Sequence, residues 1–168
     1  MPPRLEAVLG DLTAEPTDAI VNAANPGLAR GAGVCGAIFA AAGPGLEEAC
    51  ATLGGCATGD ATLTPGFALP ARYIVHAVGP VWGGGTQGEP ELLGSAYRRS
   101  LEVASEAGAR TIAFPAISTG IYGYPLVEAT EVAVRTCRDD APPEIELIRF
   151  VCFDDRTLDA YERELAAP

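Results

Sequence analysis

The chain has 168 residues, a length that suits one domain, 1–168, with a full hydrophobic core. Its formal net charge is −11, and all eleven basic side chains are arginines, because the sequence contains no lysine. Such a surface repels polyanions, so we expect no nucleic-acid partner. No apolar run approaches the ~20 residues that span a bilayer, so we expect no membrane association either.

The cysteine and histidine content limits the compartment and the chemistry. Five cysteines are an odd number, and no pair has CxxC spacing. Because the N-terminal segment also lacks an apolar leader, we expect a reducing, cytoplasmic location with free thiols. A single histidine excludes a His-rich metal site, and we expect neither metal nor cofactor. Four cysteines are expected to be small buried hydrophobic side chains: Cys50, Cys56, Cys137 and Cys152.

Apolar runs typical of strands alternate with helical patterns along the chain. The elements predicted in chain order are strands 5–10 and 19–24, helices 34–42 and 44–53, strands 61–67 and 73–78, helix 90–107, strand 111–117, helix 126–138, strand 147–153 and helix 156–166. This alternation predicts an α/β layered domain around a mostly parallel sheet of six strands.

Four segments leave a predicted strand through polar or Gly-rich residues: 10–12, 22–34, 117–125 and 152–155. In open α/β sheets, ligands bind beyond the carboxyl ends of the strands. Two of these segments lead into helices through glycines, "GAGVCGAIF" at 31–39 and "STGIYG" at 118–123. Such loops present backbone N–H groups to anions, so together they fit a clamp for a diphosphate. A plain structural turn is an equally good interpretation of either loop alone. Neither has the Walker or GxGxxG pattern, which disfavours a nicotinamide enzyme.

Several polar and aromatic residues also have a purely structural interpretation. His76 lies inside a predicted strand and is more typical of a hydrogen-bonded core imidazole than of a base. Ser118 has no second histidine available for a hydrolase triad. Asn25 is a ligand candidate or shapes its turn. Trp82 fits a loop anchor as well as a ligand contact, and we expect its loop, 81–90, to be the most flexible.

Read together, these segments resemble the macrodomain family, which binds ADP-ribose. The matches run in family order and cover almost the whole chain: "GDLT" (10–13), "DAIVNAANPGL" (18–28), "GAGVCGAI" (31–38), "AAGPGLEEAC" (41–50), "GCATGDATLTPGFALPARYIVHAVGPVW" (55–82), "IAFPAISTGIYGYP" (112–125) and "FVCFDD" (150–155). The pattern is most similar to the MacroD-type branch, which hydrolyses mono-ADP-ribosylated proteins or O-acetyl-ADP-ribose. The resemblance implies a three-layer α/β/α sandwich around a mixed sheet. It also implies ADP-ribose or an ADP-ribosylated protein as the partner.

The resemblance assigns a role to each loop. Asp11 would accept a hydrogen bond from the adenine amino group, with the Leu12 backbone beside it, and Phe153 would stack on the adenine unless it is an ordinary core aromatic. Asn25 would bind the distal ribose. The diphosphate and distal ribose would contact the backbone of Gly33, Val34 and Cys35 from one side and Ser118, Thr119, Gly120, Ile121 and Tyr122 from the other.

The chain departs from the family pattern at two positions. MacroD-type members usually carry an aspartate where this chain has Cys35 and a histidine where it has Phe39. The aspartate is the favoured residue for activating the attacking water. Three interpretations of Cys35 remain: a small residue that leaves room for water oriented by Asn25 and a ligand phosphate, a catalytic thiol, or a site that binds without chemistry.

The leading hypothesis is hydrolysis of mono-ADP-ribosyl esters on acidic side chains, or of O-acetyl-ADP-ribose, by an oriented water. Asn25 and "STGIYG" favour it, because a pure reader of ADP-ribose has less need of the distal-ribose end. The alternatives are a non-catalytic reader, a phosphatase acting on ADP-ribose 1″-phosphate, and a scaffold that binds through its acidic surface. The scaffold leaves both Gly-rich loops unexplained.

Overall fold

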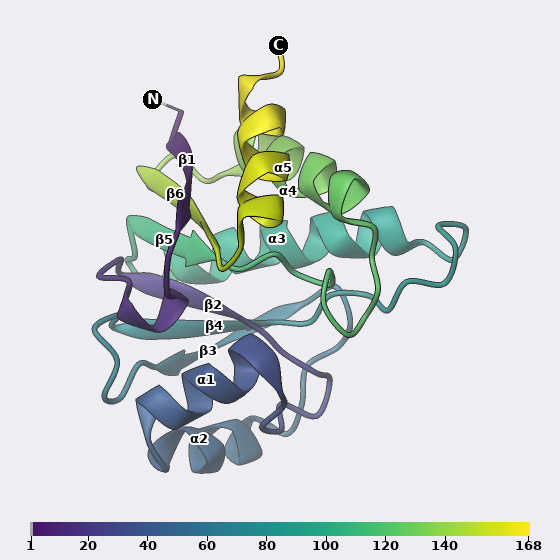
Figure 1. Ribbon diagram of the computed structural model, residues 1–168. Helices are drawn as coiled ribbons and strands as arrows, with labels where there is room; N and C mark the ends of the chain where they lie inside the picture. The colour runs from purple at the N-terminus through teal and green to yellow at the C-terminus, as the bar shows by residue number, and fades with distance from the viewer. Residues whose placement is uncertain (1) are drawn as a thin grey trace.

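A six-stranded sheet runs through the middle of the computed structural model, which describes residues 2–168 (Figure 1). Its strands lie in the order β1-β6-β5-β2-β4-β3, and all neighbours pair in parallel except β3, which is antiparallel to β4. The strands are β1 (Arg4–Leu9), β2 (Ala19–Ala23), β3 (Ala61–Pro65), β4 (Tyr73–Ala77), β5 (Thr111–Phe114) and β6 (Leu147–Cys152). The mixed, mostly parallel sheet is therefore confirmed.

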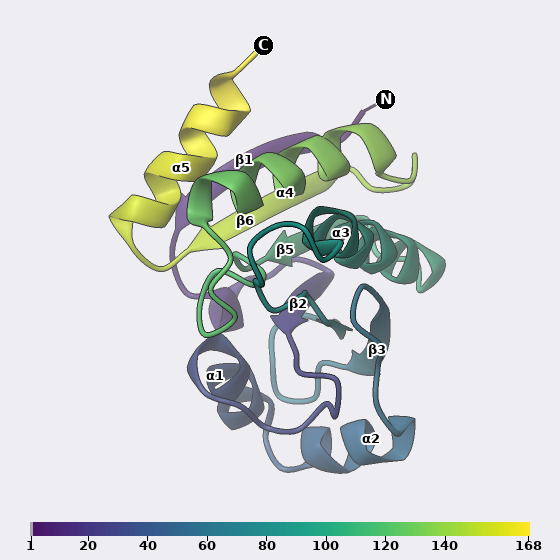
Figure 2. The same ribbon diagram turned by 90° about the vertical axis from the view of Figure 1, so that its right-hand side faces the viewer.

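Helices cover both faces of the sheet, as Figures 1 and 2 show. The helices are α1 (Gly33–Ala42), α2 (Gly45–Leu53), α3 (Glu89–Glu106), α4 (Leu126–Asp140) and α5 (Asp155–Ala166). α1 and α2 lie on one face, and α3, α4 and α5 lie on the other. This arrangement is the predicted three-layer α/β/α sandwich.

The two faces are built from alternate residues of the same strands, because successive strand side chains point to opposite sides. In β5, Ile112 and Phe114 pack beneath α3, α4 and α5, whereas Ala113 packs on the α1 and α2 side. In β2, Ile20 joins the α1 and α2 side while Val21 joins the other. Each strand is therefore packed on both faces, which fixes where the strand ends lie at the sheet edge.

The predicted strands and helices differ from the observed ones at their ends, and one short element was missed. The strand predicted over 111–117 ends at Phe114, because Pro115 has no N–H to extend the ladder. A short 3-10 helix, η1 (Leu12–Ala14), was not predicted. Within residues 2–168, no helix has the length and apolar character needed to cross a membrane.

His76 is a core imidazole, as its structural interpretation expected. Its ring is fully buried, with Asn22 Nδ2 3.0 Å from Nδ1 and Thr64 Oγ1 2.9 Å from Nε2. Burial lowers its pKa from the usual 6.5 to about 4, so the ring is neutral at physiological pH. The imidazole of β4 therefore links β2 and β3 through side-chain hydrogen bonds, and it is not exposed to a ligand.

All five cysteines are free thiols, as predicted. Cys50, Cys137 and Cys152 are buried. The prediction for Cys56 is wrong, because this residue is only half-buried. It lies in the connection between α2 and β3, at the margin of the core cluster on the α1 and α2 side, and its N–H donates to the carbonyl of Pro26 at 2.9 Å.

Candidate functional site

The predicted ligand segments gather where four neighbouring parallel strands end. β1, β6, β5 and β2 are consecutive in the sheet and run in the same direction. Asp11 follows β1, Phe153 follows β6, Ser118 follows β5 and Asn25 follows β2. Figure 2 looks onto this edge, where the loop after β5 and the loop into α1 lie on the same side. The fold thus brings together residues separated by more than a hundred positions.

Asp11 and Phe153 form one end of this edge, because Leu9 pairs with Cys152 in the β1–β6 ladder. The Asp11 carboxylate caps η1: Oδ1 accepts the N–H of Thr13 at 2.9 Å and its hydroxyl at 2.7 Å. Oδ2 makes no hydrogen bond to residues 2–168 and remains available to an N–H donor. Phe153 exposes 77% of its surface, so it is not a core aromatic. Leu12, the first residue of η1, is buried in the core cluster on the α1 and α2 side and anchors the turn.

Asn25 shapes the loop that follows β2. Its carboxamide binds both backbone groups of Ala29: Nδ2 donates to the carbonyl at 2.9 Å, and Oδ1 accepts the N–H at 3.0 Å. The turn-forming interpretation is therefore correct. Each amide atom keeps one further hydrogen-bonding position, so a role in ligand binding is compatible with this geometry.

Cys35 lies in the first turn of α1 and is buried, with Sγ 3.8 Å from the carbonyl oxygen of Ala29. The loop can approach the helix this closely because residue 36 is glycine: a Cβ there would lie 2.6 Å from the carbonyl oxygen of Gly31. The N–H groups of Gly33, Val34 and Cys35 have no acceptor within residues 2–168, as is usual for a first turn.

Phe39, one turn further along α1, is a core residue. It is 3% exposed and packs in the cluster between α1, α2 and the sheet, together with Ile38 and Leu46. Its ring therefore packs in the core beneath α1 and stabilises the position of this helix on the sheet. Nothing in its surroundings indicates a part in acid–base chemistry.

The loop after β5 forms the other Gly-rich wall. Ser118 has a left-handed φ of +69°, and its buried hydroxyl has no partner within residues 2–168. Thr119 folds back through its hydroxyl onto the carbonyl of Ala116 at 2.9 Å, while Tyr124 N donates to Ser118 O at 2.9 Å. Within the described chain, three residues of this loop have backbone N–H groups without an acceptor: Gly120, Ile121 and Tyr122. Of these, Ile121 is 88% exposed.

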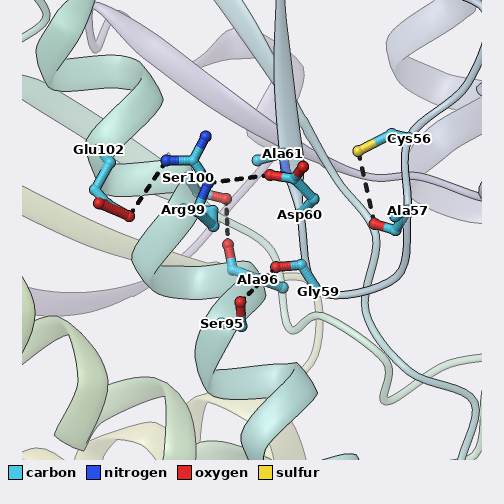
Figure 3. Close-up of polar contacts among 10 residues, drawn as sticks. All are labelled: Cys56, Ala57, Gly59, Asp60, Ala61, Ser95, Ala96, Arg99, Ser100 and Glu102. Carbon is cyan, nitrogen blue, oxygen red and sulfur yellow. Dashed lines mark hydrogen bonds and ion pairs between the residues drawn. The ribbon is translucent and has the colours of Figure 1, made fainter.

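The connection from α2 into β3 contacts both the Asn25 loop and α3, and Figure 3 shows its contacts with α3. There Asp60 Oδ1 accepts the N–H of Ala61 at 2.8 Å and Arg99 Nε of α3 at 3.0 Å. Both bonds lower the pKa of Asp60, the backbone bond more than the arginine. The same connection carries Cys56, whose N–H holds the carbonyl of Pro26 beside Asn25. The Asn25 loop is thereby joined to α3 by two contacts in series: Cys56 to Pro26, and Asp60 to Arg99.

Two surface hollows lie away from this edge. One, of about 390 Å³, borders Arg110 and Glu146, and the other, of about 280 Å³, lies between Arg98 of α3 and Arg135 of α4. Neither contains a residue predicted to bind ligand. We favour the sheet edge because free backbone donors, a free carboxylate oxygen and an exposed aromatic ring occur together there.

A family model described as Macro domain matches residues 21–133. The chain belongs to the macrodomain family. It is 55% identical over 97% of its length to a Macro domain-containing protein of Chlorobaculum tepidum, covering 96% of that protein. It is 48% identical over 98% of its length to an O-acetyl-ADP-ribose deacetylase of Enterobacter cloacae, covering 95% of that enzyme.

Solved macrodomains share this fold. The chain superposes on the Oceanobacillus iheyensis macrodomain with ADP with a TM-score of 0.88 and 40% identity, covering 95% of this chain and 88% of that one. The Trypanosoma brucei macrodomain in complex with ADP-ribose gives a TM-score of 0.88 and 41% identity, covering 95% of this chain and 69% of that one. The resemblance to the macrodomain family is therefore confirmed.

Two supporting residues were missed by sequence analysis. Thr13 holds the Asp11 carboxylate, and Glu89 binds the loop that follows β4. The first could have been found from "GDLT", because Asp followed by Thr two residues later is typical of a capped turn. No group of three metal-ligating side chains occurs within residues 2–168.

Proposed function

We propose that this macrodomain binds ADP-ribose at the carboxyl edge of β1, β6, β5 and β2 and hydrolyses esters at its distal ribose. The substrates are mono-ADP-ribosyl esters on acidic side chains of proteins, or O-acetyl-ADP-ribose. The main support is that two features lie along one edge of the sheet. Asp11 and Phe153 form an end suited to adenine, and beside it two loops present free backbone amides. The likeness to enzymes named O-acetyl-ADP-ribose deacetylase supports the ester chemistry.

The backbone amides explain how a chain of charge −11 holds a diphosphate. The N–H groups of Gly33 and Val34 and those of Gly120 and Ile121 act at short range as the positive ends of local dipoles. Surface charges are screened beyond roughly 10 Å at ordinary salt, so repulsion of the diphosphate by the net charge is weaker than its attraction to these N–H groups.

In the proposed reaction, water attacks the ester and releases the carboxylic acid with free ADP-ribose. Asn25 fixes the loop beside the distal ribose and orients the substrate hydroxyls, and a phosphate oxygen of the ligand helps to orient the water. Holding the reacting groups in place supplies much of such an acceleration. An ester needs no covalent thiol intermediate, so Cys35 is assigned the role of a small residue that leaves space for water.

A non-catalytic reader of ADP-ribose is the second candidate. It is favoured by Cys35, which places a buried thiol directed at Ala29 O where the family pattern has the water-activating aspartate. Incubation with a protein carrying mono-ADP-ribose on glutamate, following release of ADP-ribose, separates the two. Calorimetry with ADP-ribose, with and without EDTA, tests binding and its independence of metal. Hydrolysis supports the proposed enzyme, binding without release supports the reader, and no heat at millimolar ligand contradicts both.

A further inference from the structure

The Glu89 carboxylate is buried at the start of α3 and binds the loop that precedes it. Oε2 accepts the N–H groups of Gly83 at 2.8 Å and Gly85 at 2.9 Å, and Oε1 accepts that of Gln87 at 2.6 Å. The residue is only 1% exposed. These donors, Gly85 first among them, lower the pKa of Glu89 to about 2, so it stays charged at physiological pH.

The loop is shaped to enclose this carboxylate. Gly84, Gly85 and Gly88 have φ values of +103°, +90° and +80°, a conformation that other residues rarely adopt. Two features exclude a side chain at Gly85: its positive φ, and the ring of Trp82, which would lie 2.8 Å from a Cβ at this position. The segment expected to be most flexible is thus tied at three points to one carboxylate.

Trp82 connects this loop to the proposed diphosphate loop. Its backbone N–H donates to the carbonyl of Tyr122 at 2.8 Å, and its ring packs on Tyr124 with centroids 4.6 Å apart. Burial raises the pKa of the Tyr124 hydroxyl, and the negative charge of Glu89 raises it further. A continuous path of contacts therefore runs from Glu89 through Gly85 and Trp82 to Tyr122.

We propose that Glu89 is a positioning residue for the diphosphate loop 118–122, acting through Trp82. This inference rests on the proposed binding of ADP-ribose at that loop. The carboxylate holds loop 82–88, which holds Trp82 in place, and Trp82 fixes the carbonyl of Tyr122. With that carbonyl held, the N–H groups of Gly120 and Ile121 keep one direction before ligand arrives, which reduces the ordering cost of binding.

The test compares Glu89→Gln with Glu91→Gln, a matched control in the same helical turn whose exposed carboxylate makes no hydrogen bond within residues 2–168. Glutamine keeps the size of Glu89, but its single oxygen cannot serve three N–H donors. We expect Glu89→Gln to raise the Kd for ADP-ribose and ADP by roughly 2- to 30-fold, the range for a residue acting through its neighbours. The Kd for adenosine, which lacks the diphosphate, should stay unchanged, and Glu91→Gln should match wild type throughout.

A merely structural role would not produce this division between ligands. Equal weakening for adenosine and ADP-ribose, or wild-type affinity in folded Glu89→Gln, overturns the inference. If Glu89→Gln does not fold, Trp82→Leu takes its place, since it removes the ring contacts and leaves the carboxylate; the same division is expected.

Amide hydrogen exchange measured without ligand separates failure of this inference from failure of the proposed function. Glu89→Gln should speed exchange at the Trp82 amide and leave α5 unchanged. If wild type binds no ADP-ribose, the proposed function is wrong, and exchange still decides whether Glu89 holds Trp82. Unchanged exchange at Trp82 contradicts the positioning role.

Discussion

Asn25 and Cys35 meet at one backbone atom, the carbonyl oxygen of Ala29, which lies 2.9 Å from Asn25 Nδ2 and 3.8 Å from Cys35 Sγ. Both side chains also border Gly31, where a Cβ would lie 3.5 Å from the sulfur and 3.9 Å from the amide nitrogen. The residue proposed to orient the substrate and the cysteine in the first turn of α1 therefore share one small space. Changes at the two positions should affect catalysis differently, because only Asn25 holds the loop with two hydrogen bonds.

Asn25→Ala is expected to lower the rate of ADP-ribose release by roughly 100-fold, the cost of a misplaced reacting group. The substitution removes both bonds to Ala29 and the amide that we propose binds the distal ribose. Stopped assays on a mono-ADP-ribosylated protein measure the rate, and calorimetry measures ADP-ribose affinity. Asn25→Asp, which keeps the bond to Ala29 N but loses the donor, is the companion variant. A wild-type rate in Asn25→Ala would exclude the proposed role.

Asp11→Ala is expected to weaken ADP-ribose binding by about 1.5–3 kcal/mol, roughly 10- to 150-fold in Kd, as for a lost hydrogen bond to a charged group. Wild type should bind inosine-diphosphate-ribose poorly, because hypoxanthine lacks the amino donor, and Asp11→Ala should discriminate little between the two ligands.

Thr13→Val serves as a graded control, because it removes the hydroxyl at 2.7 Å from Asp11 and keeps the backbone bond. Its discrimination between adenine and hypoxanthine should lie between those of wild type and Asp11→Ala. Equal wild-type affinity for the two nucleotides refutes the assignment of Asp11.

His76 should make folding stability depend on pH between 6.5 and 5. Burial lowers its pKa to about 4, so the unfolded chain takes up a proton below pH 6.5 that the folded chain does not. The stabilisation is complete above pH 6.5 and is lost as pH falls, by roughly 1.5 kcal/mol between pH 6.5 and 5. Because the chain has one histidine, denaturant titrations across this range report mainly on this group. His76→Gln, which cannot titrate, should remove most of the slope, and an unchanged slope would contradict the assignment.

The sheet and its layers could be predicted because their signals are local. Consecutive strand residues point to opposite faces of the sheet, and in β5 they are all apolar: Ile112, Ala113 and Phe114. This pattern is typical of a strand covered by helices on both sides. The edge that gathers the loops follows from parallel strands alone. The family pattern then supplied roles that spacing could not, since neither Gly-rich loop is specific by itself.

The support behind the site could not be predicted, because it depends on contacts between distant segments. Glycines at 83–85 suggest mobility in a sequence, whereas in the fold the Glu89 carboxylate accepts the N–H groups of Gly83 and Gly85. Likewise, nothing in the sequence places the Cys56 N–H against Pro26. Such contacts follow from how α2, α3 and the loops pack, which no single segment encodes.

Cys35 provides the sharpest test of mechanism. If Asn25 and the loop amides position the water, Cys35→Ala should keep most of the wild-type rate, because the thiol contributes neither proton transfer nor a covalent bond. If a better base is all that this site lacks, Cys35→Asp should raise kcat, since a carboxylate in the first turn of α1 is favoured by the helix dipole and can take a proton from water.

The Asp variant separates two opposing effects of the same charge. A second negative group near the diphosphate raises the Kd for ADP-ribose, whereas a general base raises kcat, so both constants are measured. A rise in kcat with a weaker Kd supports the oriented-water mechanism. Loss of turnover in Cys35→Ala with unchanged ADP-ribose affinity would instead make the thiol catalytic. Tight binding by wild type without release from any modified protein assigns the chain to the readers, and Cys35→Asp then tests whether one carboxylate converts a reader into a hydrolase.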